Sequence, residues 1–352
     1  MSGKKTGPKK GPDTFFAAKV YPAPFFLPDW PAPARVRALC TTRAGGCSEG
    51  PWFSLNLGER CGDDPEHVRR NRARLEALLP APPLWLHQVH GVDVIHHPGR
   101  PGAPGAAAPQ ADGLVAHGPG EVCAVLAADC LPVLFCDRAG TRVAAAHAGW
   151  RGLAAGVLQA TVRALETEPG DLLAWLGPAI GPGVYEVGSE VAQAFAGYAA
   201  GLRPGRRDDR WLLDLYTLAR LKLAEAGVPA VYGGGLCTFS DPARFFSYRR
   251  DGTTGRMASV IWLADQGPGR AQGALLQDAL YEAMRDGIPA ALLRLRKCAS
   301  IPPPSLAKGA ASVASGGCVP KGAKIGRKAS PTLGIPPAHC VHRPPSGREG
   351  GT

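Results

Sequence analysis

Two neighbouring segments decide the fold: EVCAVLAADCLPVLFCD at residues 121–137 and TRVAAAHAGWRGLAAGVLQATVRAL at residues 141–165. In the first, two apolar runs flank a polar Ala-Asp-Cys turn, which predicts two consecutive buried strands. The second begins as a strand and turns at residues 147–149 into a helix that ends near Leu165. Strands that follow one another directly, beside a strand that leads into a helix, predict an α+β domain. We expect mixed β layers flanked by helices and not a doubly wound parallel sheet.

The neighbouring segments continue this mixture of strands and helices. Residues 63–79 are expected to form a helix, because acidic residues and a proline precede an apolar stripe. Residues 213–228 place their leucines at helical spacing and predict a second helix. Residues 34–46 and 231–263 are expected to supply further strands, and residues 83–97 two short strands around a glycine.

The charge distribution predicts how the chain is divided. The 352 residues carry a formal net charge of +11, with +4 in residues 1–20 and +7 in residues 271–352. We therefore expect a disordered basic arm over 1–20, a catalytic domain over 21–264, and an extension over 265–352 that is mostly a disordered Pro/Gly/Ala-rich tail. Because the excess charge flanks prolines and glycines and lines no periodic segment, nucleic acid is not an expected partner.

Composition also bears on location. No run of 18 apolar residues occurs, so neither a membrane span nor a membrane partner is expected. The N-terminus MSGKKTGPKKGPDTFF lacks the apolar stretch of a signal peptide. The ten cysteines include no CxxC pair and form no compact framework. We therefore expect reduced thiols and a cytoplasmic protein.

Three short motifs carry the residue types that chemistry needs: HQVHG at 87–91, ADC at 128–130 and HAGWRG at 147–152. Taken singly, each has an ordinary explanation, because an isolated cysteine after an apolar strand is usually a small buried side chain. Taken together, a thiolate and two imidazoles are preferred ligands of zinc. Three protein ligands leave the fourth position for water or substrate, which is the catalytic pattern. The ligands would come from three segments, so the site would exist only in the folded protein.

Copper fits the composition less well than zinc. A blue-copper centre needs two histidines, a cysteine and an axial methionine. The chain has nine histidines without any HxH pair, and three methionines. Zinc is therefore the expected metal.

Three arginines are candidates for binding an anion. Arg43 lies in TTRAGG, Arg151 begins the helix after the HAG turn, and Arg249 lies in SYRRDG. Arginine binds phosphate or carboxylate through two parallel hydrogen bonds, and the start of a helix adds positive potential. Surface ion pairing explains each arginine equally well on its own.

At these motifs the chain resembles the polyphenol oxidase or laccase-like family. Its members are also described as zinc-containing purine nucleoside phosphorylases and as peptidoglycan editing factor-like proteins. The matching stretches run in the family's order from about 41 to 263: TTRAGGCSEGPWFSLNLGERCGDDPEHVRRNRARL, HQVHGVDV, ADGLVA, AADCLPVLF, AAAHAGWRGLAAGV, WLGPAIGPGVYEVG and FFSYRRDGTTGRMASVIWL. The resemblance implies a single α+β domain similar to cysteine hydrolases, and it leaves the basic arm and the C-terminal extension outside.

The resemblance also implies a function and a set of site residues. The family's zinc ligands carry over to His90, Cys130 and His147, which would also be the catalytic residues. Independently of the resemblance, His87 and the three arginines are expected to contact substrate or phosphate. The implied reaction converts adenosine, inosine or methylthioadenosine and phosphate to the base and ribose 1-phosphate, with adenosine deaminase activity at the same zinc. Copper is reported for the family. The partners would be purine nucleosides and phosphate, and the protein would be a monomer or weak dimer.

Two other functions remain open at this stage. A metal-free hydrolase could use Cys130 as nucleophile and His147 or His90 as base on an amide bond, in a role such as quality control of cell-wall precursors. A non-catalytic binding protein would require the cysteine and the histidines to be structural. Zinc content separates the first alternative from the phosphorylase, and turnover of adenosine or inosine with and without phosphate separates the second.

Overall fold

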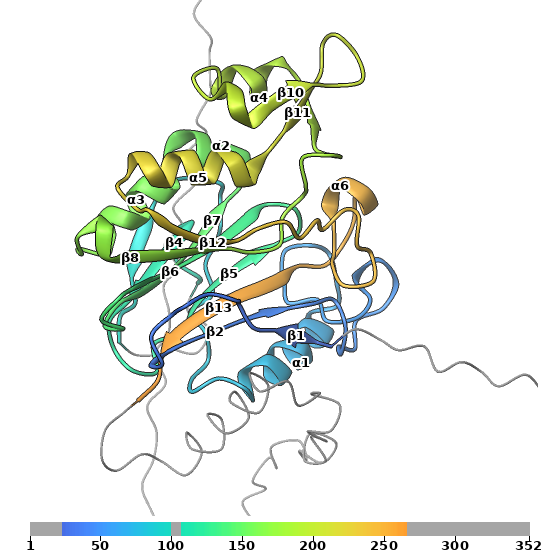
Figure 1. The fold of residues 1–352 in the computed structure, drawn as a ribbon. Coiled ribbons are helices and arrows are strands. Elements are labelled where there is room, and N and C mark those ends of the chain that lie inside the picture. Colours follow the sequence, from blue (N-terminus) through green and yellow to red (C-terminus); the bar gives the residue numbers. More distant parts are fainter. Residues whose placement is uncertain (1–22, 100–106, 266–352) are drawn as a thin grey trace, which may run out of the picture. The chain divides into compact units, whose positions relative to one another are not determined.

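A six-stranded mixed sheet forms the middle of the computed structural model, which describes residues 23–99 and 107–265 (Figure 1). The outermost pair of strands at each edge is parallel, and the three inner pairs are antiparallel. In spatial order the strands are β12 (Ala230–Gly233), β8 (Leu172–Leu176), β6 (Leu131–Asp137), β7 (Val143–Ala148), β4 (Gly113–Ala116) and β3 (Val94–His96).

A second, four-stranded antiparallel sheet lies against the first. Its strands, in spatial order, are β1 (Phe25–Phe26), β2 (Val36–Thr41), β13 (Met257–Leu263) and β5 (Cys123–Ala127). The two consecutive strands predicted from residues 121–137 are therefore β5 and β6, which belong to different sheets. The Ala-Asp-Cys turn carries the chain from one sheet to the other, so Cys130 lies where the two sheets meet.

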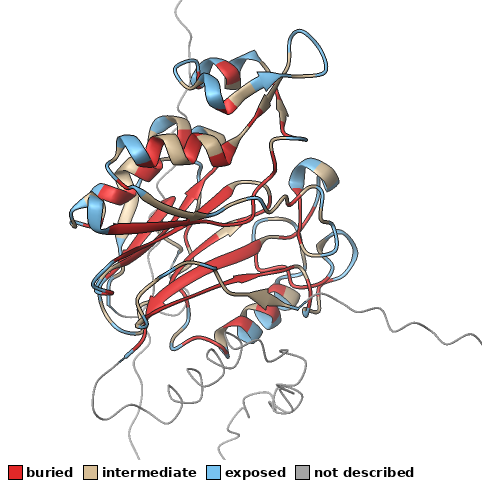
Figure 2. Ribbon diagram, viewed as in Figure 1, coloured by how far each residue is buried: buried red, intermediate tan, exposed pale blue. Residues whose placement is uncertain are grey.

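The core consists of three apolar layers because both sheets are covered on both faces. Leu134 and Ala145 of the six-stranded sheet pack against Val125 and Ile261 of the four-stranded sheet. The alternate residues on the outer face of the six-stranded sheet, among them Phe135, pack against helices. Strands buried on both faces read as continuous apolar runs, which is why LPVLFC was recognisable as a strand. Figure 2 shows the inner strands of both sheets as buried, whereas the edge strands β1, β3 and β12 are mostly of intermediate exposure.

Four of the described helices lie on the two outer faces: α2 (Trp150–Ala155), α3 (Val157–Ala164) and α5 (Leu215–Glu225) over the six-stranded sheet, and α1 (Pro65–Glu76) under the other (Figure 1). Asp64 caps α1, and Asp214 caps α5 by accepting the backbone N–H groups of Tyr216 and Thr217. The helices are α1 (Pro65–Glu76), α2 (Trp150–Ala155), α3 (Val157–Ala164), α4 (Ser189–Ala194), α5 (Leu215–Glu225) and α6 (Tyr248–Asp251).

A small three-stranded sheet and three short 3₁₀ helices complete the described part of the chain. The small sheet stands beside α4 (Figure 1). Its strands, in spatial order, are β10 (Leu202–Pro204), β11 (Trp211–Leu213) and β9 (Glu186–Val187), and the 3₁₀ helices are Gly50–Trp52, Pro169–Asp171 and Ala199–Gly201.

The predicted fold class is confirmed, since the domain is α+β with mixed sheets flanked by helices. Two local expectations differ. The helix expected up to Leu165 is split into α2 and α3, because Gly156 adopts a left-handed φ of 104°. Residues 83–97 contain one strand, β3, and not two.

The arm predicted over 1–20 lies outside the described residues, as does the extension predicted over 265–352 apart from its first residue, Asp265. The boundaries predicted for the catalytic domain stay a prediction. Within 23–99 and 107–265, none of the helices has the length and apolarity needed to cross a bilayer.

Candidate functional site

Three side chains that are far apart in the sequence meet at one end of the junction between the sheets. The candidate ligand atoms of His90, Cys130 and His147 all lie within 4.8 Å of one another. His90 Nε2 lies 3.6 Å from Cys130 Sγ, and the two imidazole rings meet edge to face with centroids 4.8 Å apart. We call these three residues the Cys/His cluster.

The strand pairing explains why the cluster forms. His147 belongs to β7 and pairs with Pro132 of β6, while Cys130 immediately precedes β6. The antiparallel register therefore places the cysteine beside the histidine. His147 is almost completely buried, whereas the His90 side chain is exposed and closes the cluster from the solvent side.

A buried carboxylate, Asp112, holds two members of the cluster. Its Oδ1 accepts hydrogen bonds from His147 Nδ1 at 2.8 Å and from the backbone N–H of His90 at 3.0 Å. Its Oδ2 accepts from the backbone N–H groups of Gly91 at 2.7 Å and Val89 at 3.1 Å. Burial opposes the charge on Asp112, but these hydrogen bonds lower its pKa below the ordinary value. The carboxylate thus fixes the orientation of His147 and the path of the loop that carries His90.

The sequence prediction did not include Asp112. The available signal was the Ala-Asp-Gly sequence directly before the buried strand β4. A carboxylate at the start of a buried strand needs donors, and those donors belong to residues 89–91 and 147, which only the fold brings there.

The electrostatics of the cluster favour a thiolate. Burial alone would raise the pKa of Cys130, but attraction and hydrogen bonding from His147 and His90 lower it to about 6. Burial would lower the pKa of His147, but Cys130 and Asp112 raise it to about 9. In the absence of a metal ion, these opposite shifts favour a thiolate–imidazolium pair. A thiolate beside imidazole nitrogens is also a donor set suited to a transition metal.

Asp129 holds the turn that presents Cys130. Its backbone has a left-handed φ of 96°, which is strained for a residue with a side chain. Asp129 Oδ1 accepts from Thr238 Oγ1 at 2.6 Å, and Oδ2 accepts from the backbone N–H of Arg249 at 2.6 Å. The backbone carbonyl accepts from Ile180. Three separate segments thus stabilise this unusual conformation.

Gly149 makes room for the cluster. A Cβ atom at this position would lie 2.7 Å from His90 Cδ2 and 3.0 Å from Cys130 Sγ. Any side chain at position 149 would therefore displace two of the three members. This close approach explains the glycine in the HAG turn.

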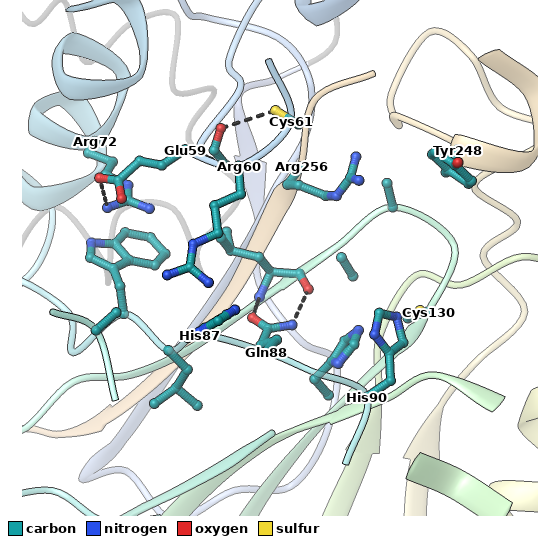
Figure 3. A pocket seen from close by; sticks show the side chains of 18 residues that line it. Glu59, Arg60, Cys61, Arg72, His87, Gln88, His90, Cys130, Tyr248 and Arg256 are labelled. Atoms are coloured by element: carbon teal, nitrogen blue, oxygen red, sulfur yellow. Dashed lines mark hydrogen bonds and ion pairs between the residues drawn. The ribbon is translucent and has the colours of Figure 1, made fainter. Parts of the chain in front are cut away.

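A cavity of about 450 Å³ opens beside the cluster (Figure 3). His90, Cys130 and His147 lie in its wall, together with His87 and Gln88. The Gln88 side chain bonds both backbone groups of Leu126, which holds this loop against β5. The remaining lining residues are Gly58, Glu59, Arg60, Cys61, Arg72, Trp85, Leu86, Ala108, Leu126, Ala127, Ala128, Tyr248 and Arg256.

The predicted arginines do not line this cavity. The Arg43 guanidinium donates to the carbonyls of Phe53 and Pro242. The exposed Arg151 lies over its neighbour Trp150, with 4.3 Å between the guanidinium carbon and the ring centroid.

Arg249 donates from Nη1 to the Glu186 carbonyl and lies over Tyr185. Burial raises the pKa of Tyr185, Cys130 raises it further, and Arg249 and Arg151 lower it. Arg151 and Arg249 therefore both act on Tyr185, a side chain whose pKa also responds to Cys130. Their role in phosphate binding stays a prediction.

Two arginines that the sequence prediction did not select, Arg60 and Arg256, do line the cavity. Cys61 lies there too and donates from Sγ to the Gly58 carbonyl at 3.1 Å. The sequence placed these residues inside segments that resemble the family, but it gave no indication of which side chains face the site.

Comparisons with known proteins bear on the identity of this site. Residues 37–264 match the family model described as multi-copper polyphenol oxidoreductase laccase. The purine nucleoside phosphorylase PA4543 of Pseudomonas aeruginosa is 55% identical over 245 residues, which cover 68% of this chain and 99% of the relative. The purine nucleoside phosphorylase YfiH of Escherichia coli is 54% identical over 241 residues, which cover 67% and 98%.

Solved structures agree with these matches. The protein NMB0706 of Neisseria meningitidis has a TM-score of 0.65 and 50% identity, with 69% of this chain and all of that chain covered. YlmD from Geobacillus stearothermophilus has a TM-score of 0.61 and 36% identity, with 66% and 93% covered.

Proposed function

Since the chain belongs to the multi-copper polyphenol oxidoreductase laccase family, we propose that it is a purine nucleoside phosphorylase, the activity named for its relatives from Pseudomonas aeruginosa and Escherichia coli. One structural observation carries the proposal: His90, Cys130 and His147 converge in the wall of a cavity of about 450 Å³. A concave site with a few convergent polar groups and perturbed pKa values is the usual form of a small-molecule active site.

We propose that the cluster holds one zinc ion. The donor set fits, because two imidazoles and a thiolate are typical zinc ligands and Cys130 is ionised near neutral pH. Asp112 supports the fit, since metal-binding histidines commonly donate their other ring nitrogen to a carboxylate. When bound, zinc supplies Lewis acidity that polarises a group placed beside it. Copper, to which the family name refers, remains the second candidate for this site.

In the proposed phosphorolysis, the bond from C1′ of the ribose to the base nitrogen breaks, and a bond from C1′ to a phosphate oxygen forms. The base leaves with a proton. The chain's contribution is to bind and orient: Asp112 holds His147, and the exposed ring of Tyr248 at the cavity wall offers a surface on which a purine can stack. The proposed adenosine deamination replaces the 6-amino group by a water oxygen and releases ammonia.

Turnover and metal content test this proposal. Purified full-length protein should contain one zinc per chain by elemental analysis. It should release hypoxanthine from inosine only when phosphate is present, and inosine from adenosine without phosphate. Cys130→Ala should lose the metal and both activities. Full zinc retention in Cys130→Ala would show that the ligands are assigned wrongly.

A second candidate function, which the named relatives do not favour, rests on the geometry of the cluster. In space, Cys130 lies beside His147, and His147 is hydrogen-bonded to Asp112. Cysteine hydrolases use the same arrangement of nucleophile, base and carboxylate. A metal-free protein that cleaves amide bonds and leaves nucleosides unchanged would identify this hydrolase.

The remaining expectations belong to the same proposal. We propose that residues 21–264 form the catalytic domain, because the family match and all described helices and strands fall within them. The seven described cysteines are free thiols, which supports work in a reducing compartment such as the cytoplasm. A monomer or weak dimer stays a prediction.

A further inference from the structure

The wall of the cavity away from the Cys/His cluster carries more positive than negative charge. Its charged side chains are Glu59, Arg60, Arg72 and Arg256. Glu59 pairs with Arg72, which also donates to the Leu57 carbonyl and lies 4.3 Å over the Trp85 ring. Arg72 is therefore neutralised and fixed as part of the wall, and two arginines remain.

Arg60 has no partner in the part of the chain that the structure describes. Its guanidinium forms no hydrogen bond or ion pair with residues 23–99 or 107–265. The neighbouring carboxylates are engaged elsewhere: Asp63 bonds Ser48 and Asn56, and Asp64 caps α1. Figure 3 shows the Arg60 side chain directed into the cavity toward His87 and Gln88. An unpaired cation inside a concave, partly apolar wall attracts an anion more strongly than one on open surface.

Arg256 supplies the second charge. Its Nη1 donates to the carbonyls of Thr254 and Gly255, and the guanidinium lies 5.9 Å from the centroid of the Tyr248 ring. Within 23–99 and 107–265, its Nε and Nη2 have no hydrogen-bond acceptor. These donors remain for a ligand.

The fold holds the turn that carries Arg60 against the backbone of Arg256, while Figure 3 shows the Arg60 guanidinium directed toward His87 and the Arg256 guanidinium toward Tyr248. Asn56 is fully buried, and its Oδ1 accepts from the backbone N–H of Gly58 at 2.9 Å and of Arg256 at 2.8 Å. Gly58 allows close contact, because a Cβ atom there would lie 2.7 Å from Arg256 Cγ. Trp52 Nε1 donates to the Cys61 carbonyl and holds the far side of the turn. The turn that carries Arg60 is thus positioned against Arg256 before any ligand binds.

We propose that Arg60 and Arg256 form a phosphoryl-binding subsite in the wall of the cavity. Two guanidinium groups match the charge of a phosphate dianion, and each can donate paired hydrogen bonds to phosphate oxygens. The choice of a phosphoryl group over another anion rests on the proposed function. Two sources fit this chemistry: inorganic phosphate as co-substrate, or the phosphate group of a nucleoside 5′-monophosphate.

Calorimetric titrations of full-length protein test the subsite without any turnover. The ligands are inorganic phosphate, adenosine and AMP, with sodium chloride at matched ionic strength to reveal unspecific screening. The variant is Arg60→Gln, which changes an exposed turn residue and should leave the fold intact. The matched control is Arg69→Gln on α1, because Arg69 pairs with Glu66 and does not line the cavity.

Arg60→Gln should weaken phosphoryl binding about tenfold to a hundredfold, the loss expected for a charge-assisted hydrogen bond. Adenosine affinity and all affinities of Arg69→Gln should stay unchanged. If weaker inorganic phosphate binding is the main effect, free phosphate is the occupant. If wild-type protein prefers AMP over adenosine and Arg60→Gln loses that preference, the subsite binds the phosphate group of a nucleoside 5′-monophosphate.

Equal affinities of wild type and Arg60→Gln for both phosphate and AMP would overturn the subsite, as would wild-type protein that binds neither more tightly than chloride. Arg256→Gln provides an independent check, since its effect should be less than additive with Arg60→Gln when both touch one anion. Binding that depends on Arg60 without any phosphorolysis would sustain the subsite and reject the proposed reaction, so the two failures are distinguishable.

Discussion

Asp112→Asn should damage the site and the fold together, because one carboxylate supports both. Asp112 accepts four hydrogen bonds, two at each oxygen, from the His147 ring and three backbone N–H groups. Asparagine keeps one acceptor oxygen and turns an NH₂ group toward the other two donors. Two charge-assisted hydrogen bonds are lost at about 1.5–3 kcal/mol each, so the free energy of unfolding should fall by about 3–6 kcal/mol.

Thermal denaturation and a zinc competition titration with a chromogenic chelator measure the two effects. A loss of this size should lower Tm by about 6–24 °C in a domain of this length. Zinc affinity should fall about tenfold to a hundredfold, as it does when the carboxylate partner of a ligating histidine is removed. The control is Asp93→Asn, because Asp93 is exposed and its side chain makes no hydrogen bond to the described residues. Unchanged Tm and unchanged zinc affinity in Asp112→Asn would show that this carboxylate supports neither the fold nor the site.

Three further outcomes follow from single contacts. Gly149→Ala should lower zinc occupancy in a folded protein, because its Cβ would lie 2.7 Å from His90 Cδ2 and 3.0 Å from Cys130 Sγ; elemental analysis with circular dichroism checks this. If Arg151 binds phosphate, Arg151→Ala should slow phosphorolysis by about two to three powers of ten and deamination much less. Wild-type rates of both reactions in Arg151→Ala would remove Arg151 from the site. Asp214→Ala should cost about 1 kcal/mol in urea denaturation, because the cap of α5 is lost; an unchanged midpoint would argue against the cap.

The fold class was predictable because the sequence pattern is local and strong. The apolar runs of β5 and β6 are buried on both faces, so they stand out without any tertiary information. Their assignment to different sheets was not predictable, since strand pairing depends on partners such as β13, more than a hundred residues away.

The site was predictable to the extent that metal-ligating residue types stand out in a sequence. Cys130 and the two histidines were selected by residue type, motif and resemblance. Asp112 was not selected, because its role depends on donors from two other segments. The arginines show the same limit: the sequence does not reveal that Arg43 bonds the Phe53 carbonyl or that Arg60 faces the cavity.

The proposed activity of the cavity beside the Cys/His cluster is phosphorolysis of purine nucleosides. The most direct measurement is release of hypoxanthine from inosine by purified, zinc-loaded full-length protein, followed by chromatography at several phosphate concentrations. The proposed phosphorolysis predicts release that rises with phosphate and saturates, with ribose 1-phosphate formed in equal amount. No release at any phosphate concentration, from protein shown to contain one zinc per chain, would contradict it.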